Sequence, residues 1–258
     1  MYGDLARIGL VVPSTNSVVE PELTAHAPPG VAFYATRVPV VEVERQEDKV
    51  ASIVAMRDRV PAAAAELGSL QPSAVIFACT SASFLDGRDV DADTCADLSV
   101  AANAPACTTS TAVVTALQAL GVERLAVVTP YVAPVGDGAV RYLEQSGFTV
   151  TARRDLGLLS NLAKGELPVD ASERLAREVD LTGADAVLIS CTNWRSLDRL
   201  ASLERDLGLP VVSSNLASLW AGLRLAGVHA GGPDVALMER PGTTLLERLG
   251  PVGAEAPA

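Results

Sequence analysis

Short runs of apolar residues alternate along the chain with longer stretches that are rich in Ala, Leu, Glu and Arg. The apolar runs are bounded by Pro, Gly and polar turn residues, a pattern that predicts strands buried on both faces, at residues 7–12, 31–35, 74–78, 125–128, 149–152, 186–189 and 210–212. The intervening stretches predict helices at residues 44–70, 110–120, 134–146, 171–181, 196–207 and 216–226. Because parallel strands need a crossover between them, this alternation predicts an α/β fold with parallel sheets.

The second half of the chain repeats the first. Residues 7–13 (RIGLVVP) return 117 positions later as RLAVVTP, and residues 73–80 (SAVIFACT) return 112 positions later as DAVLISCT. A third block at residues 105–110 (PACTTS) returns 105 positions later as PVVSSN, each time followed by a helical segment. The blocks keep their order, which indicates a duplicated α/β unit with pseudo-two-fold symmetry. The alternative is chance resemblance, because all parallel-sheet proteins repeat the order strand, turn, helix.

No long linker separates the two repeats, so we expect them to pack continuously around a central cleft. The expected division places residues 1–108 together with 216–258 in the first domain, and residues 109–215 in the second. Each domain then carries one copy of the Cys-Thr block, at Cys79 and at Cys191.

Composition limits the function. The chain has 258 residues and a net charge of −11, without a basic stripe to neutralise phosphates, so nucleic acid is not an expected partner. No apolar run approaches the length of a membrane span, and residues 1–4 (MYGD) lack a cationic signal region, so we expect a cytoplasmic protein without membrane contact. The two histidines, His26 and His229, have no neighbouring metal ligands, and no phosphate-binding glycine motif is present, so neither a metal nor a nucleotide cofactor is expected.

In proteins with parallel α/β sheets, ligand-binding and catalytic residues lie beyond the carboxyl ends of the strands. After the first strand come Ser14, Thr15 and Asn16, which could bind a carboxylate or could cap the following helix. Tyr131 occupies the corresponding turn of the second repeat, where it could donate to an oxyanion or lie on the surface. Asn161 follows a later strand of the second repeat and could contribute an amide or be a loop residue.

Cys79 and Cys191 each follow a strand directly, with Thr80 and Ser81 after the first and Thr192 after the second. Either thiol alone could be a buried structural cysteine. Their equivalent positions in two repeats predict that they face each other across one cleft, as two-sided proton transfer at a carbon centre requires. Nearby helix N-termini predict lowered thiol pKa values. The remaining cysteines, Cys95 and Cys107, have no such placement and are expected to pack in the interior.

Together these motifs resemble the aspartate/glutamate racemase superfamily, and within it the maleate cis–trans isomerase and arylmalonate decarboxylase branch. The resemblance runs from about residue 6 to residue 228 and rests on residues 7–16, 78–81, 128–131, 161 and 190–192. It implies two flavodoxin-like α/β domains, a small dicarboxylate or amino-acid-like substrate between them, no cofactor, and a homo-oligomer.

The resemblance also implies roles for individual residues. Cys79 matches the nucleophile that adds to the alkene in maleate isomerases, and Cys191 matches the general acid/base. Asn16, Tyr131 and Asn161 match residues that hold the substrate carboxylates, while Thr80, Ser81 and Thr192 match donors of the anion pockets. Ser14 lies in the same turn as Asn16 and is therefore a further candidate for substrate binding. The residues after the second cysteine, Asn193, Trp194 and Arg195, depart from the expected pattern.

The expected function is therefore cofactor-independent cis–trans isomerisation of a small unsaturated dicarboxylate. Amino-acid racemases of the superfamily also keep both thiols, so a racemase remains an alternative. An arylmalonate-type decarboxylase is disfavoured because those enzymes typically have glycine at the position of Cys79. A non-catalytic protein that binds small acids is the alternative from a different class.

Overall fold

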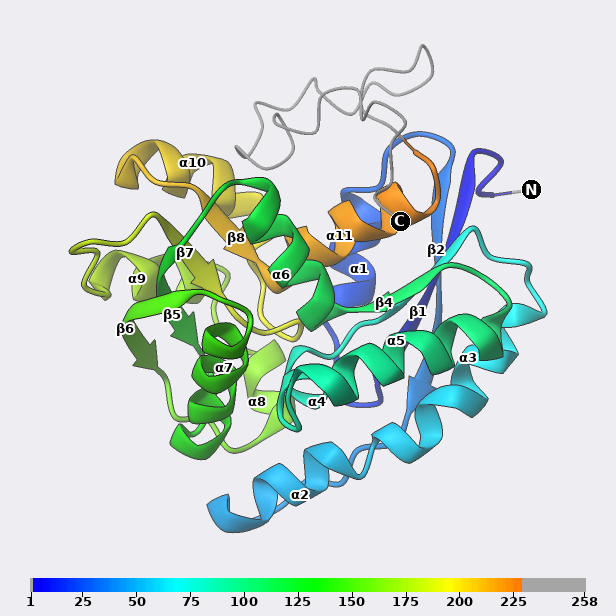
Figure 1. Ribbon diagram of the computed structural model, residues 1–258, viewed down its shortest axis with the longest axis horizontal. Coiled ribbons are helices and arrows are strands. Elements are labelled where there is room, and N and C mark those ends of the chain that lie inside the picture. Colours follow the sequence, from blue (N-terminus) through cyan, green and yellow to red (C-terminus); the bar gives the residue numbers. More distant parts are fainter. Residues whose placement is uncertain (1, 229–258) are drawn as a thin grey trace.

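The computed structural model describes residues 2–228, so His229 and residues 229–258 of the expected first domain lie outside the described residues. It contains two four-stranded parallel sheets, ordered β2-β1-β3-β4 and β6-β5-β7-β8 (Figure 1). The strands of the first sheet are β1 (Ala6–Pro13), β2 (Val31–Val38), β3 (Ala74–Phe77) and β4 (Ala106–Thr108). Those of the second are β5 (Arg124–Thr129), β6 (Thr149–Asp155), β7 (Ala186–Ile189) and β8 (Val211–Ser213). The prediction of an α/β fold with parallel sheets in two similar halves is confirmed.

Strand register shows that the two halves are equivalent. Leu10 of β1 pairs with Ile76 of β3, and Val127 of β5 pairs with Leu188 of β7. The sequence repeats relate these same two pairs, by 117 residues for the first member and 112 for the second. The third repeat agrees, because Ile76 pairs with Cys107 and Leu188 pairs with Val212.

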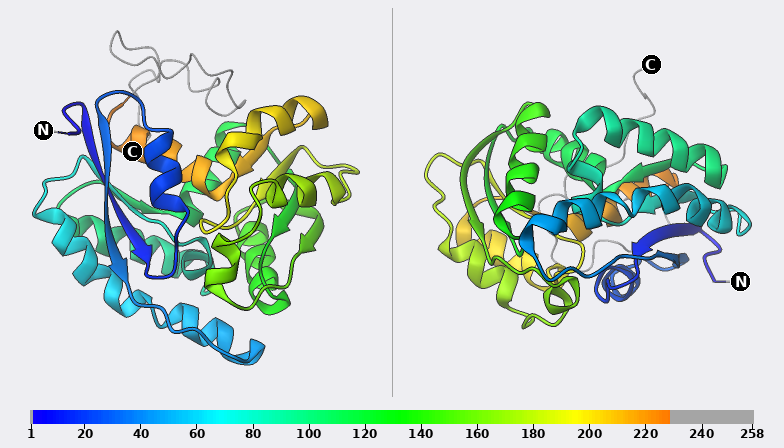
Figure 2. Two further views of the ribbon diagram at one scale, coloured as in Figure 1. Left: turned by 180° about the vertical axis from the view of Figure 1, so that it is seen from behind. Right: turned by 90° about the horizontal axis from the view of Figure 1, so that it is seen from below.

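Helices cover the sheets and join the two halves. In the first half they are α1 (Val19–Ala25), α2 (Lys49–Val54), α3 (Val60–Gly68), α4 (Thr80–Phe84) and α5 (Arg88–Ala102). Then follow α6 (Thr109–Ala119), α7 (Ala133–Gln145), α8 (Asn161–Gly165), α9 (Ala171–Glu178), α10 (Leu197–Leu207) and α11 (Ser214–Leu225). Helices α6 and α11 pack against each other between the two sheets (Figure 1), and Figure 2 shows the two halves of the molecule from behind and from below.

The helices α6 and α11 begin in the same way. The Thr108 hydroxyl accepts the N–H of Thr111, and the Ser213 hydroxyl accepts the N–H of Leu216, so each helix is capped by the last residue of its preceding strand. Helix α11 also packs against β3 and β4 of the first sheet. It packs against β8 of the second sheet as well, so the domain division expected from the sequence stays a prediction.

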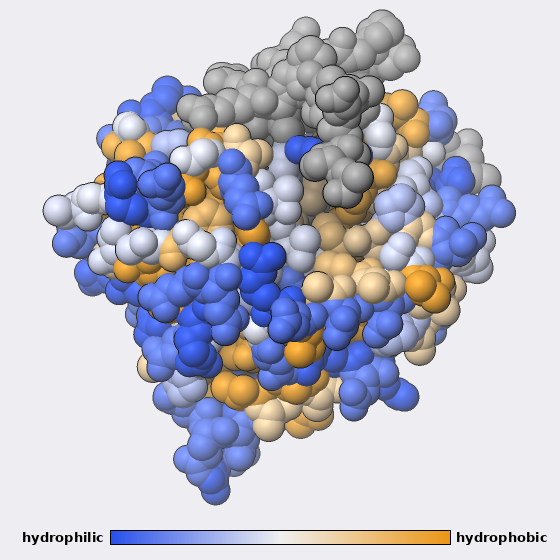
Figure 3. All heavy atoms as spheres, viewed as in Figure 1, coloured by the Kyte–Doolittle hydropathy of each residue, from blue (hydrophilic) through white to orange (hydrophobic). Residues whose placement is uncertain are grey.

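The apolar pattern follows from this layering. The central strands β1, β3, β5 and β7 are almost entirely buried, whereas the edge strands β2 and β6 are half-exposed. Helices cover both faces of a central strand, which therefore consists of continuous apolar residues. On the face shown in Figure 3, hydrophilic residues predominate and hydrophobic residues are exposed between them. No helix of residues 2–228 is long and apolar enough to cross a membrane.

Several elements differ from the sequence prediction. The single helix expected at residues 44–70 is divided into α2, α3 and the short 3₁₀ helices η1 (Gln46–Asp48) and η2 (Arg57–Arg59). Pro61 in the first turn of α3 accounts for the new start. Helix α5 mixes small apolar residues with acidic ones and buries only Asp91, Leu98 and Ala102, so its sequence carries no clear helical period. Strand β4, with three residues, was missed as a strand although it belongs to the third repeat.

Candidate active site

The carboxyl ends of strands from the two halves meet at one place. The Thr192 hydroxyl, beyond β7, donates to the backbone carbonyl of Ala78, beyond β3, at 3.1 Å. The same hydroxyl accepts a 3.0 Å hydrogen bond from the Asn16 side chain, beyond β1. All three groups are buried, so one hydroxyl joins the two sheets beside both cysteines.

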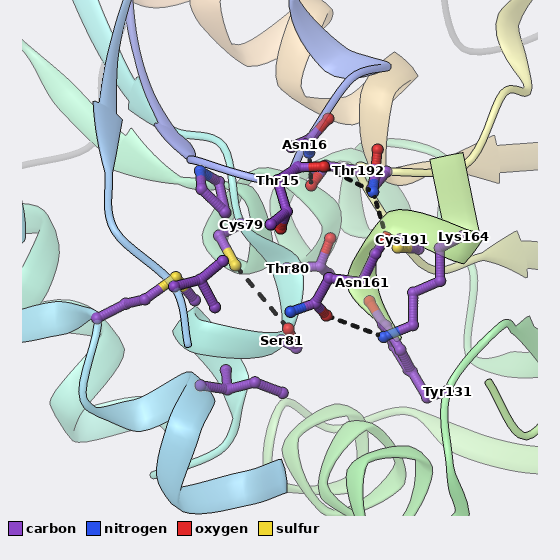
Figure 4. Close-up of a pocket in the computed structure, with 15 residues that line it drawn as sticks. Thr15, Asn16, Cys79, Thr80, Ser81, Tyr131, Asn161, Lys164, Cys191 and Thr192 are labelled. Atoms are coloured by element: carbon purple, nitrogen blue, oxygen red, sulfur yellow. Dashed lines mark hydrogen bonds between the residues drawn. The ribbon is translucent and has the colours of Figure 1, made fainter. Parts of the chain in front are cut away.

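A small cavity opens at this junction (Figure 4). The residues that line it are Pro13, Thr15, Asn16, Val40, Ile53, Met56, Cys79, Thr80, Ser81, Tyr131, Asn161, Lys164, Cys191, Thr192 and Asn193. The structure thus brings together every site residue expected from the sequence except Ser14. That residue is exposed, and its hydroxyl accepts the N–H of Val40 instead.

Cys79 lies between β3 and α4, where its extended backbone directs the thiol into the cavity. Its Sγ is 3.8 Å from the Ser81 hydroxyl. Burial raises the pKa of the Cys79 thiol to about 11, although the Ala82 N–H, Ser81 and the charge of Lys164 oppose this effect. The expected lowering of the Cys79 pKa is therefore wrong for this structure, because α4 has five residues and desolvation outweighs its few donors.

Cys191 occupies the equivalent position at the end of β7. Burial also raises the pKa of its thiol, so the expectation of a lowered value is wrong here as well. The Lys164 ammonium, the N–H of Asn193 and the Tyr131 hydroxyl stabilise the Cys191 thiolate and oppose the increase. A negative charge on Cys191 further raises the pKa of Cys79, so the site favours one thiolate rather than two.

Tyr131 lies in the turn after β5, which corresponds in the second half to the turn after β1 that contains Asn16. Its backbone N–H donates to the Thr129 hydroxyl at 2.9 Å, which fixes the turn, and its ring packs edge-on against Phe84. Burial and the neighbouring cysteines raise the pKa of the phenol well above its usual value. The phenol therefore stays protonated and serves as a hydrogen-bond donor toward Cys191.

The two ends of the Asn16 side-chain amide make different contacts, and carboxylate binding by this residue stays a prediction. Its side-chain oxygen accepts the N–H groups of Val18 and Val19, at 2.9 and 3.1 Å, and so fixes the turn that leads into α1, whose N-cap residue is Val18. Its amide nitrogen lies at the cavity and donates to Thr192. These bonds orient the amide, which leaves the nitrogen facing the site.

The side of the cavity opposite Cys79 is formed by α8. Asn161 begins this helix, and its side-chain oxygen accepts a 3.2 Å hydrogen bond from Lys164. Asn193 donates to the Asn161 carbonyl at 2.7 Å and accepts the N–H of Ser17 at 3.0 Å, so it ties α8 to the turn after β1. At Gly165 a Cβ would collide with Ser17 and Asn193, so glycine permits this close approach.

Sequence reasoning did not assign five of the residues that line the site. Lys164 and Asn193 line the cavity, and Val40, Ile53 and Met56 form an apolar wall beside Cys79. A repeat comparison could have drawn attention to Asn193, which follows the Cys-Thr pair, but Lys164 has no signal beyond its closeness to Asn161.

The other singled-out residues lie elsewhere. Trp194 is fully buried and Arg195 is exposed, with a 3.4 Å hydrogen bond to the Leu167 carbonyl; neither lines the cavity. Cys95 of α5 and Cys107 of β4 are also outside it. Within residues 2–228, no group of three His, Cys, Asp or Glu side chains is placed to hold a metal ion.

Comparison with known proteins agrees with this geometry. A sequence model of the arylmalonate decarboxylase family matches residues 8–236. A maleate isomerase from Nocardia farcinica is 33% identical over 246 residues, which is 92% of this chain and 96% of the relative. An arylmalonate decarboxylase from Bordetella bronchiseptica is 32% identical over 232 residues, which is 85% of this chain and 90% of the relative.

A solved structure is similarly close. It is the Nocardia farcinica maleate cis–trans isomerase, with one cysteine replaced by serine and a covalently bound succinylcysteine intermediate. It superimposes with a TM-score of 0.79 at 30% identity, covering 89% of this chain and 96% of that one. The resemblance drawn from the repeated Cys-Thr blocks is confirmed: the chain belongs to the arylmalonate decarboxylase family, in which maleate isomerases are among its relatives.

Proposed function

We propose that this protein is a cofactor-independent cis–trans isomerase that converts maleate, or a close unsaturated dicarboxylate, into its trans isomer. The observation that carries the proposal is the pair of buried thiols, Cys79 and Cys191, at equivalent strand ends on one cavity. A relative with 33% identity is a maleate isomerase, and the structure of that Nocardia enzyme holds a succinylcysteine adduct.

The reaction follows from thiol addition to a conjugated alkene. The Cys79 sulfur forms a bond to one alkene carbon, and the π electron pair moves to the neighbouring carbon, where the attached carboxylate delocalises it. The former double bond is then single, so it rotates. Departure of the sulfur returns the electron pair to the carbon–carbon bond and leaves the two carboxylates trans.

Cys191 accepts and returns the proton that the reaction moves. As a thiolate it takes the proton of the Cys79 thiol, whose pKa of about 11 leaves roughly one molecule in ten thousand ionised at pH 7 without such help. As a thiol it donates that proton to the carbon that carries the negative charge, which gives a succinyl adduct on Cys79. After rotation it removes the proton again, and the sulfur leaves.

The remaining polar groups suit the two carboxylates. Asn16, Tyr131 and Asn161, whose side chains carry hydrogen-bond donors, line the cavity. Such preoriented donors stabilise the negative charge that develops on one carboxylate during addition. The apolar wall of Val40, Ile53 and Met56 excludes water from the alkene.

Proton NMR in deuterated water tests the proposal, with maleate, aspartate, glutamate and an arylmalonate as substrates. We expect maleate to be converted into fumarate. Deuterium incorporation at Cα of an amino acid with maleate unchanged would establish a racemase, and loss of carbon dioxide from the arylmalonate would establish a decarboxylase. Either result would overturn the proposal.

The thiol variants Cys79→Ala and Cys191→Ala should each abolish turnover with the fold intact. Cys95→Ala is the matched control, because it removes a thiol outside the cavity and should retain activity. Alkylation by iodoacetamide distinguishes a non-catalytic binding protein: protection of Cys79 by maleate supports the proposal, and near-normal activity in either cavity variant contradicts it. The homo-oligomer and cytoplasmic location stay predictions.

A further inference from the structure

Within residues 2–228, Lys164 is a buried cation that forms no salt bridge with a carboxylate. Its side chain is 4% exposed, and among the described residues that line the cavity it is the one cationic side chain. Its ammonium donates to the Asn161 side-chain oxygen at 3.2 Å and lies 5.4 Å from the centre of the Tyr131 ring. Within residues 2–228 it forms no ion pair with a carboxylate.

A second buried lysine shows the contrast. Lys49, at the start of α2, is fully buried, but its ammonium lies 3.7 Å from the carboxylate of Glu42. That carboxylate in turn accepts the N–H groups of Asn161 and Leu162, at 2.9 and 3.3 Å. The Glu42 carboxylate therefore pairs with the Lys49 ammonium and binds the first N–H groups of α8. Among residues 2–228, Lys164 pairs with no carboxylate in this way.

A buried ammonium with only neutral contacts is costly, because desolvation is not repaid by a counter-charge. Burial accordingly lowers the pKa of Lys164, while negative charge on Cys191, Glu42 or Cys79 raises it. The ammonium has three N–H donors, and the Asn161 oxygen accepts one of them. Figure 4 shows the Lys164 ammonium beside Tyr131, on the Cys191 side of the cavity.

We propose that Lys164 is a specificity-determining residue, whose ammonium binds one carboxylate of the substrate and makes a doubly charged acid the preferred ligand. This inference rests on the proposed function, since it assigns one of the two carboxylates of that substrate. The protein carries a net charge of −11, which disfavours a dianion overall, so a local buried cation supplies the attraction that the surface lacks.

Binding of unreactive analogues tests the proposal without requiring turnover. The probes are succinate, which has two carboxylates, and succinamate, in which one carboxylate is a neutral amide of the same shape. Dissociation constants are measured by titration calorimetry for the wild type, Lys164→Met, Lys164→Arg and Arg195→Met. The last variant is the matched control, because it removes a positive charge that is exposed and outside the cavity.

We expect Lys164→Met to weaken succinate binding roughly 10- to 100-fold and succinamate binding by no more than about 3-fold, because a hydrogen bond to a charged group is lost for one ligand only. Lys164→Arg should keep most of the preference, and Arg195→Met should bind both ligands as the wild type does. Equal weakening of the binding of both ligands by Lys164→Met would overturn the proposal. The role of the ammonium would then be to stabilise the thiolates instead of binding a carboxylate.

The two proposals fail separately. If the wild type leaves maleate unchanged while its preference for succinate over succinamate is lost in Lys164→Met, the proposed function is wrong and the lysine assignment stands. If maleate is isomerised but the preference for succinate persists in Lys164→Met, the lysine assignment is wrong. Circular dichroism and the urea-unfolding midpoint verify that each variant is folded, and Lys164→Gln repeats the test with a polar side chain.

Discussion

Thr192→Val tests whether one hydroxyl holds the two halves together at the site. Valine keeps the shape of threonine but lacks the oxygen that donates to the Ala78 carbonyl at 3.1 Å and accepts from Asn16 at 3.0 Å. Both partners are buried, and a buried polar group that loses its partner costs about 1–2 kcal/mol. With two such groups, we expect the free energy of unfolding to fall by about 2–4 kcal/mol.

Urea unfolding followed by circular dichroism measures this loss through linear extrapolation. Thr115→Val is the matched control, because the Thr115 hydroxyl is exposed and bonds only to a carbonyl of its own helix, at 2.8 Å. The control should lose less than about 0.5 kcal/mol. The reasoning is refuted if Thr192→Val loses no more stability than the control, since the hydroxyl would then contribute nothing to joining the halves.

Two further predictions concern ionisation. Tyr131→Phe removes the phenol that stabilises the Cys191 thiolate, so we expect the pH profile of kcat/KM to shift to higher pH and its maximum to fall about 10-fold; an unshifted profile would contradict the assigned hydrogen bond. Burial raises the pKa of Asp91 above 3.8, although Thr108, Tyr142 and Thr111 donate to it. The folded protein therefore binds that proton more tightly than the unfolded chain, and the free energy of unfolding falls as pH rises above about 3.8. In Asp91→Asn this part of the slope should disappear, as urea unfolding between pH 4 and 7 can measure; an unchanged slope would show that Asp91 does not contribute.

Much of the fold was predictable because it depends on local pattern. The buried central strands are continuous apolar runs, and their ends are marked by polar turns at Ser14, Cys79 and Cys191. Equivalent blocks in two halves also predicted that Cys79 and Cys191 share a cavity, because duplicated units place equivalent strand ends around a pseudo-two-fold axis. The short elements β4 and α8 escaped prediction because three to five residues carry little periodic signal.

The ionisation of the site could not be predicted in this way. Position after a strand suggested lowered thiol pKa values, yet burial raises the pKa of both Cys79 and Cys191. Desolvation depends on every atom packed around a group, and those atoms come from both halves of the chain. Ser14 illustrates the same limit, because its turn lies at the site while its own side chain points to the surface.

The amino-acid sequence by itself determined the layers, the duplication and the two thiols, since these follow from the period of apolar residues and from repeats along one dimension. Only the tertiary structure decided that Lys164 of α8 lies beside Cys191 and Tyr131, and that Glu42 is already occupied by Lys49. The physical reason is that charge compensation acts through space, between groups that are distant along the chain and that only packing brings within a few ångströms.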